Sequence, residues 1–170
     1  SVFLGVLAGS TIGLVSGTAG GITDLLVQRV VDAMLAFPAL VLTMALVSVF
    51  GASTSSALIA IAIVFIPGTS RVVRSAVLSV KQNMYIEAAR SVGATNVRIM
   101  VRHILPNVTA PILILVSAYV GAAILIEASL SFLGLGTQPP NPSWGLMLRG
   151  TGRRYMEEAP WMAIFPGLAI

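Results

Sequence analysis

Residues 33–70 read AMLAFPALVLTMALVSVFGASTSSALIAIAIVFIPGTS and contain no Asp, Glu, Lys or Arg. A helix crosses the roughly 30 Å hydrocarbon core of a membrane in about 20 apolar residues. The stretch is therefore too long for one crossing and about right for two. The polar residues 51–56 divide it, so we expect a hairpin of two spans, near 34–50 and 55–70. Pro38 should bend the first span and Pro67 the second.

The composition of the whole chain also indicates a membrane protein. Of its 170 residues, 56% are hydrophobic and 9% are charged, whereas about a quarter of the residues in an average soluble domain are charged. Cysteine is absent and His103 is the only histidine, which excludes disulfides, thiolate ligands and a multi-histidine metal site. We expect no metal site. The net charge is +4. In a membrane protein such a basic excess usually lies in the cytoplasmic loops, so we expect no nucleic-acid partner.

The basic residues set the predicted topology. Six of them lie between residues 71 and 102 beside one acid, Glu87, for a net charge of 6 − 1 = +5: Arg71, Arg74, Lys81, Arg90, Arg98 and Arg102. The positive-inside rule places this segment in the cytoplasm. We read it as a cytoplasmic loop, 71–106, with an external loop at 134–158.

The predicted fold class is an all-α polytopic membrane protein with a single domain over residues 1–170. Its spans lie near 1–18, 34–50, 55–70, 107–133 and 160–170. The chain has no initiator Met and stops inside an apolar run, so we expect a fragment, truncated at both ends, with about four complete spans and the start of a fifth.

Glycines recur at every fourth position of the uncharged first segment: Gly5, Gly9, Gly13, Gly17 and Gly21. Four residues advance a helix by about 400°, so these glycines form one stripe along it. In lipid, a stripe of small residues lets a second helix approach closely. We assign Gly5, Gly9, Gly13 and Gly17 to helix packing.

The basic loop contains a pattern of its own. Residues 83–93 read NMYIEAARSVG and residues 95–106 read TNVRIMVRHILP. Asn83 can cap a short helix that Gly93 ends, and a second short helix begins at Thr95 or Asn96 and ends before Pro106. Two short helices that meet at a glycine form an elbow. Physical reasoning alone leaves a docking element and a solvated re-entry loop about equally favoured.

The letters of this elbow resemble the EAA motif of ABC-importer permeases. Glu87-Ala88-Ala89, Gly93 and the closing Leu105-Pro106 carry the resemblance, and the chain departs from the consensus isoleucine at His103. A second block, EASLSFLGLG at 127–136 followed by QPP and PSWG up to 145, is similar to the C-type subunit of dipeptide, oligopeptide and nickel permeases.

The resemblance implies a type I (MetI-like) helical bundle in the bacterial plasma (inner) membrane, with coupling helices in the cytoplasm. It implies a permease subunit, not an enzyme, that pairs with a second (B-type) permease subunit in membrane lipid. Cytoplasmic ABC ATPase subunits and an extracytoplasmic substrate-binding protein complete such an importer, which moves peptides or nickel complexes. The ATPase-coupling residues are then Glu87, Ala88, Ala89, Arg90, Gly93, Leu105 and Pro106.

ATP handling is expected elsewhere. The chain lacks the Gly-x-x-x-x-Gly-Lys-Ser/Thr phosphate loop, so ATP and Mg²⁺ would be bound by the partner ATPases, with no cofactor on this chain.

Glu127 is the one acid inside a predicted span, where carboxylates are costly and often functional. It either lines the translocation path or ties the span to the external loop through hydrogen bonds. Trp144 and the prolines before it could form a seat for the binding protein or a rigid cover over the bundle.

Two other functions stay open. An ion-gradient-driven secondary transporter would depend on Glu127. A non-transporting membrane scaffold would use the glycine stripe only to assemble partners.

Overall fold

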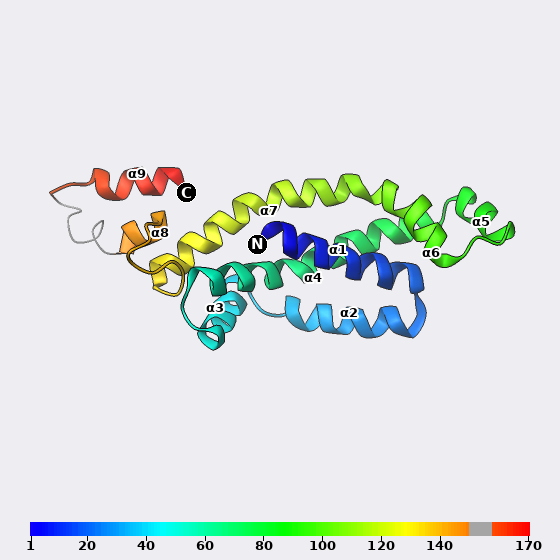
Figure 1. Cartoon of the computed structure of the whole chain (residues 1–170), viewed down its shortest axis with the longest axis horizontal. Helices are drawn as coiled ribbons and strands as arrows, with labels where there is room; N and C mark the ends of the chain where they lie inside the picture. Colours follow the sequence, from blue (N-terminus) through cyan, green and yellow to red (C-terminus); the bar gives the residue numbers. More distant parts are fainter. Residues whose placement is uncertain (150–157) are drawn as a thin grey trace. The chain divides into compact units, whose positions relative to one another are not determined.

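The computed structural model describes residues 1–149 and 158–170. All regular structure in these ranges is helical (Figure 1). The helices are α1 (Val2–Ala19), α2 (Gly21–Leu35), α3 (Ala39–Phe50), α4 (Thr54–Lys81), α5 (Met84–Ser91), α6 (Asn96–Ile99), the π-helical turn η1 (Met100–Ile104), α7 (Leu105–Leu133), α8 (Trp144–Met147) and α9 (Trp161–Ala169).

Three of these helical stretches are long and apolar enough to cross a membrane: α1, α4 and the stretch Asn96–Leu133, which ends in α7. A fourth candidate is the pair α2 and α3, taken together as one broken span. The described residues therefore contain three candidate spans, or four with the pair. The membrane boundaries predicted from the sequence stay predictions.

The predicted span at 34–50 is broken where a bend was expected. Helix α2 ends at Leu35 and α3 starts only at Ala39, with Pro38 in an extended conformation before it. Proline disfavours the α conformation in the residue before it, here Phe37, and has no N–H for a helical hydrogen bond. The helix therefore stops and restarts.

Two other helices extend beyond the predicted bounds. Helix α4 does not end near residue 70 but continues through Pro67 to Lys81. The helix predicted to end before Pro106 instead passes through η1 directly into α7. Pro106 directly follows this π turn, and the wider turn changes the hydrogen-bond register where the proline lacks an N–H.

The C-terminal part of the chain adds two short helices. Helix α8 lies within the predicted external loop 134–158, and α9 lies within the predicted span 160–170. Residues 150–157 of that loop lie outside the described residues.

Contacts divide the chain into two compact units. We call Val2–Phe37 with Val64–Ala118 the elbow unit, and Ser1, Pro38–Ile63 and Tyr119–Ile170 the loop unit.

In the elbow unit, α1 packs closely on the second half of α4. A methyl group added at Gly9 or Gly13 would come within 2.6 Å of the carbonyl oxygen of Ile66 or 2.5 Å of that of Ser70. One added at Gly17 would come within 2.9 Å of Val77. The stripe therefore provides backbone-to-backbone packing of the kind that small residues allow. Gly5 is buried as well.

The turn between α1 and α2 depends on two glycines. Gly20 and Gly21 have φ values of 68° and 60°, a left-handed region that other residues enter at a cost. This turn brings α2 back alongside α1 (Figure 1).

Candidate functional site

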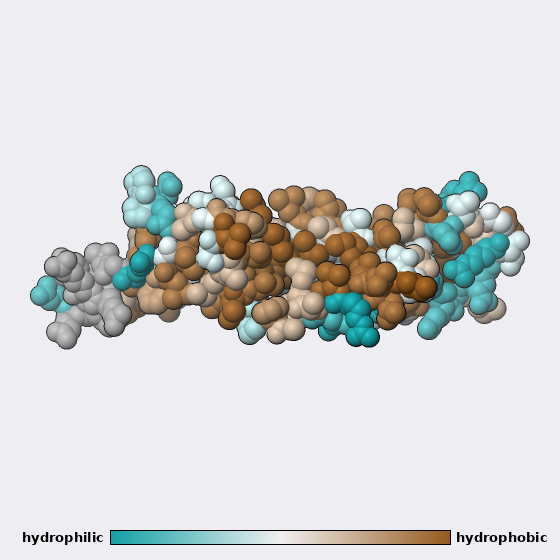
Figure 2. Space-filling view, turned by 90° about the horizontal axis from the view of Figure 1, so that it is seen from below, coloured by the Kyte–Doolittle hydropathy of each residue, from teal (hydrophilic) through white to brown (hydrophobic). Residues whose placement is uncertain are grey.

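The elbow predicted at residues 83–106 is formed by α5, α6 and η1, within the elbow unit. Figure 2 shows hydrophilic residues gathered over this end of the unit and hydrophobic residues over the neighbouring helices. The exposed positions fit a surface that meets water or another protein.

The corner of the elbow is a Schellman motif. Gly93 has a φ of 82°, its N–H donates to the carbonyl of Arg90 at 2.9 Å, and the N–H of Ala94 donates to the carbonyl of Ala89 at 3.0 Å. This pair of bonds defines the motif and satisfies carbonyls that the end of α5 would otherwise leave unpaired. A side chain at Gly93 would meet no atom within 4 Å, so glycine is required here by backbone conformation alone.

The two helix starts differ in their caps. Thr95 caps α6, because its hydroxyl accepts from the N–H of Arg98 at 3.3 Å. Asn83 occupies the cap position of α5, but its side chain donates to the carbonyl of Val80 instead. The sequence predicted both residues at these ends, and the side-chain bond of Asn83 differs from the expected one.

The elbow is attached to the unit by its buried side chains. Ile86 of α5, Ile99 of α6 and Ile104 of η1 are at most 1% exposed. They form one hydrophobic cluster with Val73, Val77 and Val108, and Ala89, Ala94 and Leu105 pack against it. A cluster of this kind holds the two short helices in a fixed position, since neither is long enough to be stable alone.

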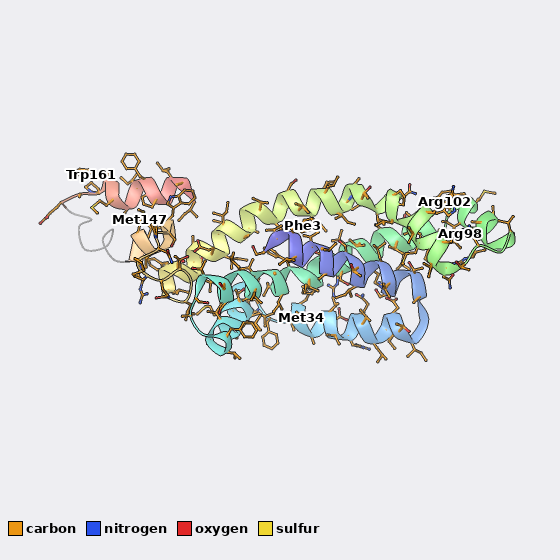
Figure 3. All side chains as sticks on the ribbon, viewed as in Figure 1. Phe3, Met34, Arg98, Arg102, Met147 and Trp161 are labelled. Carbon is orange, nitrogen blue, oxygen red and sulfur yellow. The ribbon has the colours of Figure 1, made fainter. Side chains whose placement is uncertain are left out.

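The outer face of the elbow holds a shallow groove of about 580 Å³. Its lining combines small, aromatic and basic side chains: Tyr85, Ala88, Ala89, Val92, Ala94, Arg98, Arg102 and His103. Figure 3 labels Arg98 and Arg102, which extend from successive turns of the chain at this end of the unit. Neither arginine forms an ion pair with another described residue.

The predicted coupling residues lie in two environments. Glu87, Ala88, Arg90, Gly93 and Pro106 are exposed, whereas Ala89 and Leu105 are partly buried against the hydrophobic cluster.

Tyr85, Arg98, Arg102 and His103 also line the groove, although the sequence analysis did not assign them to a coupling site. The four-residue spacing of Arg98 and Arg102 places both on one helical face. That spacing is the signal that could have found them.

Two ion pairs connect α2 to α4. Asp24 accepts two hydrogen bonds from the Arg74 guanidinium, at 2.6 Å and 2.5 Å, and Asp32 pairs with Arg71. The first pair is largely buried, with side-chain exposures of 12% for Asp24 and 30% for Arg74, and the second is half exposed. Two of the arginines counted for topology therefore also hold helices together.

Lys81 closes the end of α1. Its ammonium donates to the carbonyls of Gly17 at 2.9 Å and Thr18 at 3.1 Å. A cation there satisfies unpaired carbonyls and complements the negative end of the helix dipole. The sequence analysis missed this contact, because no local pattern indicates which helix end a distant lysine reaches.

Glu127 lies in the loop unit, near the end of α7. Its Oε1 accepts from the hydroxyls of Ser131 at 2.6 Å and Thr137 at 3.0 Å, and the N–H of Thr137 donates to the Ser131 hydroxyl at 2.9 Å. These bonds connect the helix to residues 134–138. They support the structural alternative for Glu127.

Among the described residues, no group of three or more His, Cys, Asp or Glu side chains could hold a metal ion.

Comparison with known proteins places the chain in a class of membrane transport components. A model of the family "Binding-protein-dependent transport system inner membrane component" matches residues 9–170. The chain belongs to this family of multi-pass inner-membrane permeases, which are transport components and not enzymes.

Individual relatives share nearly half of the sequence. The dipeptide transport system permease protein DppC of Alkalihalophilus pseudofirmus is 46% identical over 97% of this chain and 54% of its own length. The glutathione transport system permease protein GsiD of Pectobacterium atrosepticum is 45% identical over 100% and 56%. A putative peptide transport system permease protein of Brucella suis is 45% identical over 86% and 49%. The chain thus spans about half the length of these curated relatives.

Proposed function

We propose that this chain is part of the permease subunit of an ATP-driven importer for small peptides. The observation that carries the proposal is the elbow: a buried isoleucine cluster and a Schellman turn fix its position, while the groove lined by Ala88 and Ala89 stays open to the surface. A rigid, exposed element of this kind suits the transmission of force from a partner.

The partners follow from the same proposal. The groove, with Arg98 and Arg102, docks on a cytoplasmic ATPase subunit, which holds ATP and Mg²⁺. A second permease subunit completes the path, and an extracytoplasmic binding protein delivers the substrate. The coupling residues are Glu87, Ala88, Ala89, Arg90, Gly93, Leu105 and Pro106.

Small peptides are the substrate class that the relatives' names support. Those names refer to dipeptides, glutathione and peptides. Glutathione is itself a tripeptide, so all three share an amide backbone with charged ends. None of these three names refers to nickel.

The test reconstitutes the complete importer in proteoliposomes, with the full-length permease that contains this chain. We expect Gly93→Val to keep the complex assembled but to abolish stimulation of ATP hydrolysis by the loaded binding protein, together with peptide uptake. Valine is strained at a φ of 82° and would distort the corner.

Gly93→Asn is the matched control, since asparagine tolerates the left-handed region. It should retain most of both activities. Unchanged uptake in Gly93→Val would contradict the elbow role. Uptake that persists without ATP but collapses with an ionophore would instead indicate a gradient-driven transporter. A complex with neither activity under any condition would indicate a scaffold.

A further inference from the structure

A second cavity, in the loop unit, is lined by side chains that suit the binding of an amine. It has a volume of about 330 Å³ and is lined by Glu127, Pro142, Ser143, Trp144 and Met147. The volume is at the lower end of the range for small-molecule sites. One carboxylate, one indole and a thioether therefore meet in a space that suits a small ligand.

The carboxylate is held in place from one side only. Both hydroxyl hydrogen bonds go to Oε1 of Glu127, and no described residue donates to Oε2. None of the described basic residues forms an ion pair with it. Glu127 is partly exposed, so its second oxygen, which accepts no bond from the described residues, can accept one from a ligand.

The indole is positioned by a close contact between backbones. A methyl group at Gly145 would come within 2.1 Å of the carbonyl oxygen of Ala128, so α8 lies directly against the turn of α7 that follows Glu127. Ser143 caps α8 by accepting from the N–H of Leu146 at 3.2 Å. These contacts hold Trp144 beside the carboxylate.

The loop before the cavity is fixed in a similar way. A methyl group at Gly136 would come within 2.3 Å of the hydroxyl oxygen of Ser131. The Gln138 side chain donates to the carbonyls of Gly134 at 2.9 Å and Gly136 at 3.3 Å. The site is therefore formed before any ligand arrives, which lowers the entropic cost of binding.

We propose that this cavity binds the α-ammonium group of a transported peptide, an inference that rests on the proposed function and names its recognition element. A carboxylate accepts a charge-assisted hydrogen bond from an ammonium group. Tryptophan is the best aromatic partner for a cation. An uncharged or acylated amine has neither interaction.

Binding is measured on the full chain without any partner subunit. The chain has two tryptophans, and Trp161→Phe leaves Trp144 as the only one. Its fluorescence is followed in detergent while L-alanyl-L-alanine is added. We expect a saturable change with the free dipeptide, and binding of N-acetyl-L-alanyl-L-alanine at least about tenfold weaker.

Glu127→Gln then tests the carboxylate itself. Glutamine keeps an oxygen that can accept from Ser131 and Thr137, so the loop stays attached while the charge is lost. Dipeptide affinity should fall about tenfold. Glu158→Gln is the matched control, because Glu158 is exposed and does not line the cavity. It should bind like the parent.

Equal binding of the free and acetylated peptides, or unchanged affinity in Glu127→Gln, would overturn the proposal, and so would the absence of any fluorescence change. The importer proposal would survive each of these results, since the assay contains no ATPase. In the reconstituted importer, Glu127→Gln should raise the KM for dialanine uptake while ATP hydrolysis remains stimulated. An unchanged KM would also overturn the proposal.

Discussion

At the scale of single residues, the contact between α1 and α4 leaves no space for a methyl group. The carbonyl oxygens of Ile66 and Ser70 lie only 2.6 Å and 2.5 Å from where the Cβ atoms of Gly9 and Gly13 would be. A carbonyl in a helix cannot turn aside as a flexible side chain can. The helices must therefore separate if either glycine is replaced.

We predict that Gly13→Ala destabilises the chain by about 1–3 kcal/mol, the usual range for overpacking. Thermal unfolding in detergent measures the effect. Gly121→Ala is the control, because Gly121 lies inside α7 with no atom within 4 Å of the added methyl. It should be neutral or stabilising by up to about 1 kcal/mol, since alanine favours helix. Equal destabilisation by both substitutions would contradict the packing role.

The two ion pairs between α2 and α4 should differ in how much they contribute to the free energy of unfolding, because they differ in burial. Asp24→Asn leaves the Arg74 guanidinium unpaired in a largely buried position and should cost about 2 kcal/mol. Asp32→Asn breaks a half-exposed pair and should cost less than about 1 kcal/mol. Thermal unfolding of both single variants, and of the double variant Asp24→Asn/Arg74→Met, shows which ion pair contributes more to stability. The reverse order would show that the Asp24 pair is not the main connection.

At the scale of elements, α5 depends on one buried side chain. Ile86 is 0% exposed, whereas the neighbouring Met84 is 85% exposed. We predict that Ile86→Ala opens the elbow locally and lowers the free energy of local unfolding of α5 by about 2–5 kcal/mol. Hydrogen exchange of amides 84–94 should become faster. Met84→Ala should leave their exchange unchanged, and equally slow exchange in both variants would argue against a fixed elbow.

The elements also show where sequence reasoning succeeds. The corner at Gly93 and the cap at Thr95 are local, because each depends on a residue type and its immediate neighbours, and both were predictable. The stripe of glycines was equally visible as a period of four. The sequence does not indicate which distant residues the glycine stripe, Lys81, Arg71 and Arg74 contact. The face of α4, the carbonyls that Lys81 reaches and the acids that pair with Arg71 and Arg74 lie tens of residues away.

The differences at helix ends have the same origin. The charges after residue 70 suggested a loop, but tertiary partners for three of these side chains let α4 continue to Lys81. Pro106 suggested a helix end, but it follows the π turn η1 and the helix continues through it. Hydropathy and proline positions indicate where a helix can stop. Packing decides whether it does.

At the scale of the whole molecule, the family assignment covers residues 9–170, and the chain corresponds to about half of its curated relatives. The orientation of the two loops in the membrane follows from the charge count and stays a prediction. It bears directly on the proposed function, because an ATPase can reach the elbow only from the cytoplasm.

The absence of cysteine makes this orientation simple to test. In intact cells, Asn141→Cys should react with a membrane-impermeant maleimide, because residue 141 is exposed in the predicted external loop. Val92→Cys, at a position that is 85% exposed on the elbow, should react only after the membrane is permeabilised. The opposite labelling pattern would invert the topology and exclude a cytoplasmic ATPase as the partner of the elbow.

The bond from Lys81 to the end of α1 has a mechanical consequence. Lys81 is the last residue of α4, and α5 starts at Met84, so the residue that binds the end of α1 lies immediately before the helix proposed to contact the ATPase. A displacement of α5 is thus transmitted to the C-terminal end of α1 as well as to α4. Helices α1 and α4 would then move together. The hydrogen bonds from Lys81 to the carbonyls of Gly17 and Thr18 would have to break before α1 could slide along α4.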